Sequence, residues 1–171
     1  MNNIKYITLG VFLILMQILV SGYINIWPML YIAVFPFVLI VLPPQANRFI
    51  FLIMAFFLGL IVDIFTDSIP GLNAAATTAL AFFKRPTLKL LQNKSTLESM
   101  HGVTEYSLGF SKFTLYTIIL YMVFFLFYMG LDSFGFYSFG YSALRFITNV
   151  AANTLITILF GKALANQLFL K

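Results

Sequence analysis

The acidic side chains Asp63 and Asp67 are four residues apart, so a helix would carry both carboxylates on one face. With Arg145, they are the ionisable groups that the hydropathy pattern places nearest to an apolar environment. An unpaired charge there costs roughly 2.5–3.5 kcal/mol, which makes such groups candidate functional residues. Two interpretations follow. In the first, Asp63 pairs with Arg145 or caps the following turn while Asp67 is solvated. In the second, these side chains bind a ligand or a partner.

Catalytic constellations are almost absent from the sequence. The chain has no cysteine, and its single histidine, His101, has no second histidine with which to complete a metal site. Neither a G-x-S-x-G nor a phosphate-binding loop pattern occurs. The sequence therefore predicts a protein that is not an enzyme and holds no metal or cofactor.

The turn after Asp63 has the residues of a tight helical hairpin. Pro70 suits the first turn of the next helix, and Gly71 and Asn73 follow it. Gly59 lies one helical turn before Asp63 on the same face. Because small residues let helices approach closely, we expect Gly59 to pack against the alanines at 74, 75, 76, 79 and 81.

A second group of candidates is basic. Lys84, Arg85 and Lys89 follow the alanine-rich segment, and Arg48 precedes the segment before it. Each basic side chain near an anionic inner leaflet gains about 1 kcal/mol. We therefore expect contact with anionic phospholipid, the alternative being the docking of a cytoplasmic protein.

The composition places these residues in a membrane protein. Of 171 residues, 61% are hydrophobic and 9% are charged, and the mean hydropathy is +0.98. A soluble domain has roughly 45–50% apolar and 25% charged residues. Six spans of about 20 residues would use most of the chain. We therefore expect a single all-α domain over 1–171, a compact bundle of about six transmembrane helices.

The predicted spans are bounded by prolines, glycines and charged residues. They cover residues 7–20, 24–42, 48–65, 71–83, 113–131 and 143–168, with a polar cytoplasmic loop over 84–112. Pro28 and Pro36 fall inside the second span, where neighbouring helices can satisfy the carbonyls that proline frees.

The distribution of charge predicts the orientation. If both termini are cytoplasmic, nine of the ten basic residues fall on the cytoplasmic side and Arg145 alone falls outside, as the positive-inside rule requires. The nine are Lys5, Arg48, Lys84, Arg85, Lys89, Lys94, Lys112, Lys162 and Lys171. Since this placement accounts for the net charge of +5, we expect no nucleic-acid partner.

The segment 59–76, GLIVDIFTDSIPGLNAAA, resembles the rod shape-determining protein MreD family. That family has a G-L-x-x-D stretch, a turn with serine and proline, and then G-L-H-A at the start of an alanine-rich helix. The order of elements along most of the chain is also similar. Asn73 stands where the family usually has histidine, so a role that depends on protonation at this position is not expected here.

The resemblance implies a function in bacterial cell shape. The protein would be a non-enzymatic scaffold subunit of the elongation machinery for peptidoglycan synthesis, in the cytoplasmic (inner) membrane. Its expected direct partner is an MreC-like single-span protein. A RodA-type glycosyltransferase, a class B penicillin-binding protein and the MreB filament would belong to the same complex. Gly59, Asp63, Asp67, Pro70, Gly71, Asn73 and Arg145 are the candidates for fixing the hairpin or binding the partner.

The fold that the resemblance implies also supplies an alternative. It is similar to the substrate-binding (S) components of energy-coupling-factor transporters, which bind vitamins in an outward-facing pocket. In that interpretation Asp63, Asp67, Asn73 and Arg145 line the pocket. Many such subunits dock through an Ala-x-x-x-Ala motif in the first helix, and residues 7–20 contain none.

Overall fold

The computed structural model describes residues 2–23, 30–66, 69–132 and 139–168, and every regular element among them is an α-helix. The helices are α1 (Asn2–Tyr23), α2 (Pro36–Val41), α3 (Arg48–Phe65), α4 (Leu72–Leu91), α5 (Lys94–Ser99), α6 (Glu105–Leu108), α7 (Phe110–Asp132) and α8 (Phe139–Leu168). The prediction of an all-α protein is confirmed.

Three helices among the described residues are long and apolar enough to cross a bilayer. They are Arg48–Phe65, Phe110–Asp132 and Gly140–Ala163. The first has the bounds of the predicted span 48–65, and the other two overlap the predicted spans 113–131 and 143–168. In α1 the apolar stretch is shorter and covers Thr8–Ser21. The fold is thus compatible with an all-α membrane protein.

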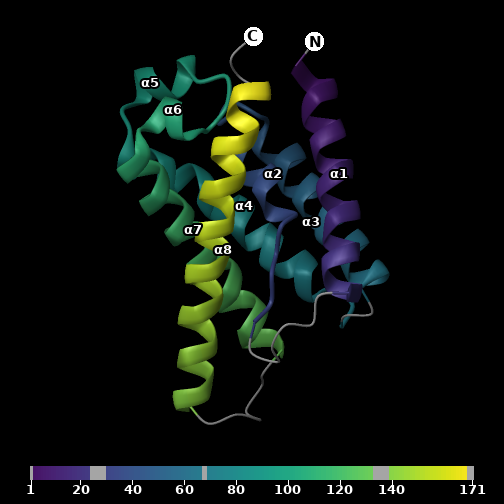
Figure 1. Cartoon of the computed structure of the whole chain (residues 1–171). Coiled ribbons are helices and arrows are strands. Elements are labelled where there is room, and N and C mark those ends of the chain that lie inside the picture. The colour runs from purple at the N-terminus through teal and green to yellow at the C-terminus, as the bar shows by residue number, and fades with distance from the viewer. Residues whose placement is uncertain (1, 24–29, 67–68, 133–138, 169–171) are drawn as a thin grey trace.

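The helices form a bundle in which α4 packs mainly against α3 and α7, and α7 packs against α8. The short α2 lies in the middle, with α1 beside α2 and α3 (Figure 1). α5 and α6 lie at one end of the bundle, together with the start of α1 and the end of α8 (Figure 1). The core gathers around α7 and includes the fully buried rings of Phe35, Tyr116, Tyr121, Phe124 and Phe125.

Residues 24–42 do not form the continuous helix that we predicted. Residues 30–34 are extended, and the helix covers only Pro36–Val41; residues 24–29 lie outside the described part of the chain. The helix begins at Pro36, because proline has no amide hydrogen to leave unpaired and its fixed φ suits the first turn of a helix. Residues 33–41 are buried, so an extended segment runs into the core.

The predicted loop 84–112 also contains more structure than expected. α4 continues to Leu91, because Leu80, Lys84 and Leu88 recur at four-residue spacing on its buried face. α5 and α6 follow, and α7 begins at Phe110.

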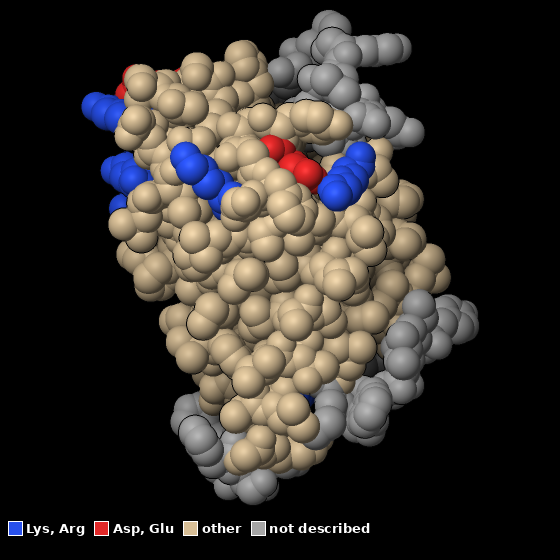
Figure 2. Space-filling view, turned by 60° about the vertical axis from the view of Figure 1, so that its left-hand side comes forward, with Lys and Arg blue, Asp and Glu red and all other residues tan. Residues whose placement is uncertain are grey.

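The charged side chains are unevenly distributed on the surface. On the face shown in Figure 2, lysine, arginine, aspartate and glutamate gather at the α5 and α6 end, and the broad band below is almost without charge. Large apolar side chains of α3, α7 and α8 are exposed along their length, among them Phe57, Leu126 and Leu155. An uncharged band beside a charged end is the surface that a bilayer requires.

Candidate functional site: a buried polar network around an extended segment

Asp63 fixes the turn between α3 and α4. Its carboxylate is 1% exposed and accepts four hydrogen bonds from the first turn of α4. Oδ2 accepts from the amides of Gly71 (3.0 Å) and Ala74 (3.1 Å), and Oδ1 accepts from the amide and the side-chain nitrogen of Asn73 (2.9 and 3.0 Å). These amides have no partner within α4, and a negative charge at a helix N-terminus is favourable. Of the expected roles for Asp63, capping of the hairpin is the one observed.

Two glycines give this hairpin its shape. Gly71 has φ = 94°, a conformation that side chains with a Cβ rarely adopt, and it is the N-cap of α4. A Cβ on Gly59 would lie 2.6 Å from both the Asn73 carbonyl oxygen and the Ala74 Cα, and closer still to the Thr77 hydroxyl. The expected close packing of Gly59 on the alanine-rich helix is confirmed, since Ala74 is one of its neighbours.

Tyr31 connects this hairpin to the extended segment. Its hydroxyl donates to Asn73 Oδ1 (3.0 Å), while Asn73 Nδ2 donates to Asp63. The Tyr31 ring stacks on Tyr128 of α7, with 4.7 Å between the ring centroids. Both ends of the buried Asn73 amide are therefore used for hydrogen bonds inside the bundle.

Two asparagines of α8 hydrogen-bond the extended backbone. Asn149 Oδ1 accepts from the Tyr31 amide (2.7 Å). Asn153 Oδ1 accepts from the Ala33 amide (2.7 Å), and its Nδ2 donates to the Tyr31 carbonyl (2.8 Å). The two asparagines are four residues apart on one face of α8 and are fully buried. Their side chains hydrogen-bond the extended backbone as the backbone of a neighbouring strand would.

The opposite side of the segment is held by α1 and α7. Gln17 Oε1 accepts from the Val34 amide (2.7 Å), and Gln17 Nε2 donates to the Ile32 carbonyl (2.9 Å). Tyr121 donates to the Ala33 carbonyl at 3.3 Å. Non-helical backbone is tolerated at membrane depth only where protein groups satisfy it, and these side chains do so.

Gln17, Asn149 and Asn153 were not among our candidates. A signal for them exists in the sequence, because three amides lie inside otherwise apolar helices and need partners that a helical ladder does not provide. A segment interrupted by Pro28 and Pro36 is where such partners would be expected.

The remaining candidates near Asp63 are placed separately. Arg145 Nη1 forms an ion pair with Asp132 Oδ2 at 2.8 Å, across the connection between α7 and α8. Asp63 and Arg145 therefore do not pair with each other. Asp63 caps α4 instead, and Arg145 pairs with Asp132. Pro70 is exposed in the turn, and Asp67 lies outside the described residues.

Lys84 is not at the surface where the sequence led us to expect lipid or partner contact. It is 2% exposed, and its ammonium donates to the carbonyls of Leu39 (2.7 Å) and Leu42 (2.6 Å) at the end of α2. It also lies 4.8 Å from the centroid of the Phe51 ring. The reason is the continuation of α4, which turns Lys84 onto the buried face.

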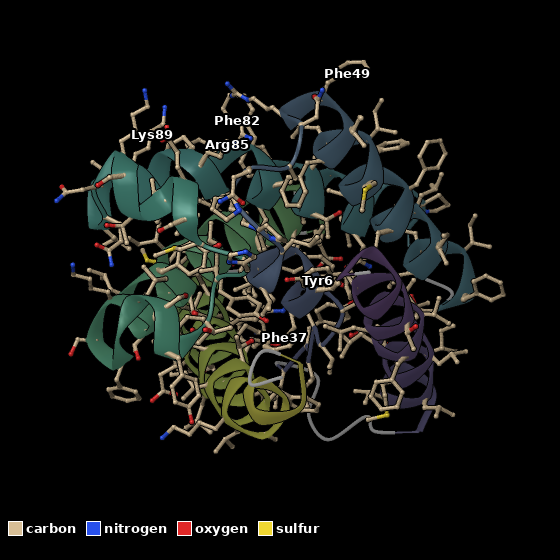
Figure 3. The ribbon with its side chains drawn as sticks, turned by 90° about the horizontal axis from the view of Figure 1, so that it is seen from above. Tyr6, Phe37, Phe49, Phe82, Arg85 and Lys89 are labelled. Carbon is tan, nitrogen blue, oxygen red and sulfur yellow. The ribbon has the colours of Figure 1, made fainter. Side chains whose placement is uncertain are left out.

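Arg85 shares this internal role in part. Its Nε donates to the Pro44 carbonyl (3.0 Å) and its Nη2 to the Ala46 carbonyl (2.5 Å), so the half-buried guanidinium fixes the loop between α2 and α3. Lys89 and Arg48 are exposed, and Arg48 lies over the Phe82 ring at 4.6 Å. Viewed from the α5 and α6 end, Phe49, Phe82 and Lys89 lie at the rim of the bundle (Figure 3).

Replacing Lys84 by methionine tests the internal role. Lys84→Met keeps the length of the side chain but leaves the two α2 carbonyls without their donor, and hydrogen bonds to charged groups contribute about 1.5–3 kcal/mol. We expect a lower midpoint of thermal unfolding in detergent. Lys89→Met, five residues along the same helix and exposed, is the matched control and should leave the midpoint unchanged. Equal midpoints for the two variants would contradict the role assigned to Lys84.

The buried hydrogen bonds around Asp63 and the extended segment hold the helices together. Among the described residues, no three histidine, aspartate or glutamate side chains gather in a way that could hold a metal ion. The network instead joins α1, α3, α4, α8 and the extended segment through buried hydrogen bonds. Comparison of the chain with protein-family models, with curated proteins and with solved structures gave no match.

Proposed function

We propose that the protein is a non-enzymatic scaffold subunit of the bacterial cell-elongation complex, similar to the MreD family. It resides in the cytoplasmic membrane with six spans, the second of which covers residues 24–42 and ends in α2. Its α5 and α6 end, which carries the basic side chains, faces the cytoplasm together with both termini, in accord with the positive-inside rule. The proposed arrangement of the spans is that of the S-component fold.

The observation that carries this proposal is the capping of α4 by Asp63. The residues of the resemblance, Gly59, Asp63, Gly71 and Asn73, contact one another and form one rigid hairpin. Their types and spacing thus have a physical reason within a single motif. A neutral imidazole also has one donor and one acceptor, so asparagine keeps the two side-chain hydrogen bonds that histidine could make at position 73.

The same geometry favours the scaffold over the vitamin-binding alternative. Asp63 and Asn73, two of the four residues proposed to line a pocket, are 1% and 0% exposed and bind each other and the start of α4. Arg145 is engaged with Asp132. A site whose polar groups are consumed by internal hydrogen bonds is suited to presenting a fixed surface.

The partner that we propose is the single transmembrane helix of an MreC-like protein, beside which the RodA-type glycosyltransferase, the class B penicillin-binding protein and the MreB filament assemble. Helix association within lipid depends on shape and hydrogen bonds, because lipid is as apolar as the helix surface. A hairpin held rigid by Asp63 provides such a shape at low entropic cost.

Depletion and complementation in the source bacterium test the proposal. Depletion should round the cells, and the wild-type gene should restore rods. Asp63→Asn replaces an acceptor oxygen by a donor that faces amide donors, so we expect it to restore neither shape nor co-purification of the MreC-like protein, normalised to inserted protein. Glu98→Gln, an exposed acidic residue, is the control and should complement.

Unchanged cell shape on depletion, together with loss of uptake of one vitamin, would reject the scaffold in favour of the transporter subunit. Rounded cells with full co-purification by Asp63→Asn would keep the scaffold and remove the hairpin from its mechanism.

A further inference from the structure

Three basic side chains lie along one edge of the bundle, at the end that carries α5 and α6. They are Arg48 at the start of α3 and Arg85 and Lys89 in the last part of α4. Arg85 lines two neighbouring hollows of the surface, one together with Arg48 and the other, of about 220 Å³, together with Lys89. Figure 3 shows Arg85 and Lys89 on the same edge as Phe49, the neighbour of Arg48 in sequence. We call Arg48, Arg85 and Lys89 the basic belt.

The two guanidinium groups of the basic belt are held in place by the fold. Arg85 donates to the Pro44 and Ala46 carbonyls, which uses two of the five N–H groups of its guanidinium. Three N–H groups remain for an anion, and the planar guanidinium matches the oxygen geometry of a phosphate. The guanidinium of Arg48 lies 4.6 Å from the centroid of the Phe82 ring, a contact that uses none of its N–H donors.

The basic belt has no acidic partner among the described residues. The ion pairs in that part of the chain are Lys94–Glu98, at 3.9 Å, and Arg145–Asp132, and neither includes a residue of the belt. Lys94 and Glu98 line the hollow beside Lys89, but their opposite charges offset each other. Neighbouring positive charges without a counter-charge repel one another, so an anion placed among them is stabilised.

An exposed apolar surface begins directly beside the basic belt. Phe49 of α3 is 71% exposed, and Ile53 of α3 and Phe82 and Phe83 of α4 are exposed as well. Since α3 starts at the end of the bundle that carries α5 and α6, and α4 finishes there, these side chains continue from the cations toward the middle of the bundle. Cations followed by apolar surface along one edge match the polarity of a phospholipid, in which acyl chains continue from a phosphate.

The combination favours an anionic lipid over the other ligands that could reach this edge. A zwitterionic headgroup carries an amine, which would meet the cations of the belt, and the nearest carboxylate, that of Glu98, already lies beside Lys94. A protein that docks from the cytoplasm could contact the cations but would leave Phe82 and Phe83 beside them uncovered. One anionic phospholipid satisfies the charges and covers the rings at the same time.

We propose that the basic belt is a specific site for one anionic phospholipid of the cytoplasmic leaflet. The phosphate binds the remaining N–H groups of Arg85, with Arg48 and Lys89 on either side, and the acyl chains lie over the exposed phenylalanines of α3 and α4. The sequence predicted contact with anionic phospholipid for four basic residues, and the burial of Lys84 leaves three of them to form the site. The site rests on the proposed membrane location and orientation, and it is independent of the scaffold function.

Native mass spectrometry of the delipidated full chain, with phosphatidylglycerol or phosphatidylethanolamine added back, tests this site. A basic side chain near an anionic membrane surface contributes about 1 kcal/mol, which equals about a fivefold change in affinity. We expect phosphatidylglycerol to bind about fivefold or more tightly than phosphatidylethanolamine, and Arg48→Gln and Lys89→Gln each to weaken its binding about fivefold. Soluble glycerol 3-phosphate at the same concentration should not displace the lipid, because it has no acyl chains.

Lys162→Gln is the matched control for Arg48→Gln. Lys162 is also exposed and lies 5.2 Å from the centroid of the Phe110 ring, so this variant removes the same charge from a cation–π contact outside the belt. It should bind phosphatidylglycerol as the wild type does. Equal losses for Lys162→Gln and Arg48→Gln would identify general attraction to anionic lipid and would overturn the proposal. Equal binding of the two lipids, or displacement by glycerol 3-phosphate, would overturn it too.

Thermal unfolding in detergent gives a second readout. A ligand that binds the folded protein alone raises its stability, so phosphatidylglycerol should raise the unfolding midpoint of the wild type and of Lys162→Gln, but not that of Arg48→Gln/Lys89→Gln. Both measurements use purified protein, so their failure would leave the scaffold proposal, which is tested by cell shape, unaffected. If the double variant keeps phosphatidylglycerol but no longer co-purifies the MreC-like protein, the belt is a protein contact and the lipid site is wrong.

Discussion

Gly59→Ala is expected to disrupt the α3–α4 hairpin, although it adds a single methyl group. The new Cβ would lie 2.6 Å from two backbone atoms of α4, so no side-chain rotation can relieve the overlap and the helices must separate. Overpacking in a close-packed core costs typically 1–3 kcal/mol, and a clash with two backbone atoms of the neighbouring helix falls at the upper end, about 3 kcal/mol. The midpoint of thermal unfolding in detergent should fall accordingly.

Gly130→Ala provides the matched control for that experiment. Gly130 also lies within a long apolar helix, but its Cβ position has no neighbour within 4 Å. Alanine is the better helix former by about 1 kcal/mol, so this variant should be as stable as the wild type or more stable. Trimming the neighbouring side chain in Gly59→Ala/Thr77→Ala should not restore stability, because the Asn73 oxygen and the Ala74 Cα remain in place. Full recovery by the double variant would show that the backbone contact does not decide the effect.

The hairpin is the part of the site that the sequence predicted best, and the reason is locality. Gly59, Asp63, Gly71 and Asn73 lie within 15 residues, and the partners of Asp63 are the amides that every helix N-terminus leaves open. Turn chemistry and capping follow from short-range spacing. The choice between capping and pairing with Arg145 needed the distance between α3 and α8, which spacing does not provide.

Lys84 shows why a local interpretation fails at a helix end. The expected end of the helix at 83 placed Lys84 in a polar loop, where a basic residue meets headgroups. With α4 continuing to Leu91, the same residue falls in line with Leu80 and Leu88 and becomes buried. The end of this helix was predicted eight residues too early. As a result, Lys84 was assigned to a surface contact, whereas it is an internal hydrogen-bond donor.

The extended segment at residues 30–34 was missed for a different reason. Hydropathy measures how apolar residues 24–42 are, and an extended segment buried among other helices is as apolar as a spanning helix. What distinguishes the two is the set of distant side chains that satisfies the backbone, and Gln17, Asn149 and Asn153 are up to 122 residues away in sequence. The extended conformation of residues 30–34 therefore depends on contacts with residues far away in sequence. A hydropathy average over neighbouring residues does not include these contacts.

Asn153→Leu is expected to release this segment from α8. The substitution removes the acceptor for the Ala33 amide and the donor for the Tyr31 carbonyl, so two buried backbone groups lose their partners. Each unsatisfied group costs about 1–3 kcal/mol, so we expect a loss of about 2–6 kcal/mol in the free energy of unfolding.

Release of the extended segment from α8 can be followed by labelling of a single introduced thiol, since the chain contains no cysteine of its own. A single thiol introduced by Ala33→Cys, at a position 1% exposed, should react slowly with a small maleimide and much faster when Asn153→Leu is added. The labelling rate reports the position of the segment itself, whereas the unfolding midpoint reports the whole bundle.

Thr154, next to Asn153, supplies a control for which we expect no loss of stability. The hydroxyl of Thr154 is buried and has no hydrogen-bond partner among the described residues. Thr154→Val removes this unsatisfied group at nearly constant volume, so it should leave the protein equally stable or more stable, with the thiol introduced by Ala33→Cys still slow to react. If Asn153→Leu and Thr154→Val behave alike in both measurements, the asparagines of α8 do not hold the extended segment, and its position must be explained by the packing of Tyr31 and Phe35 alone.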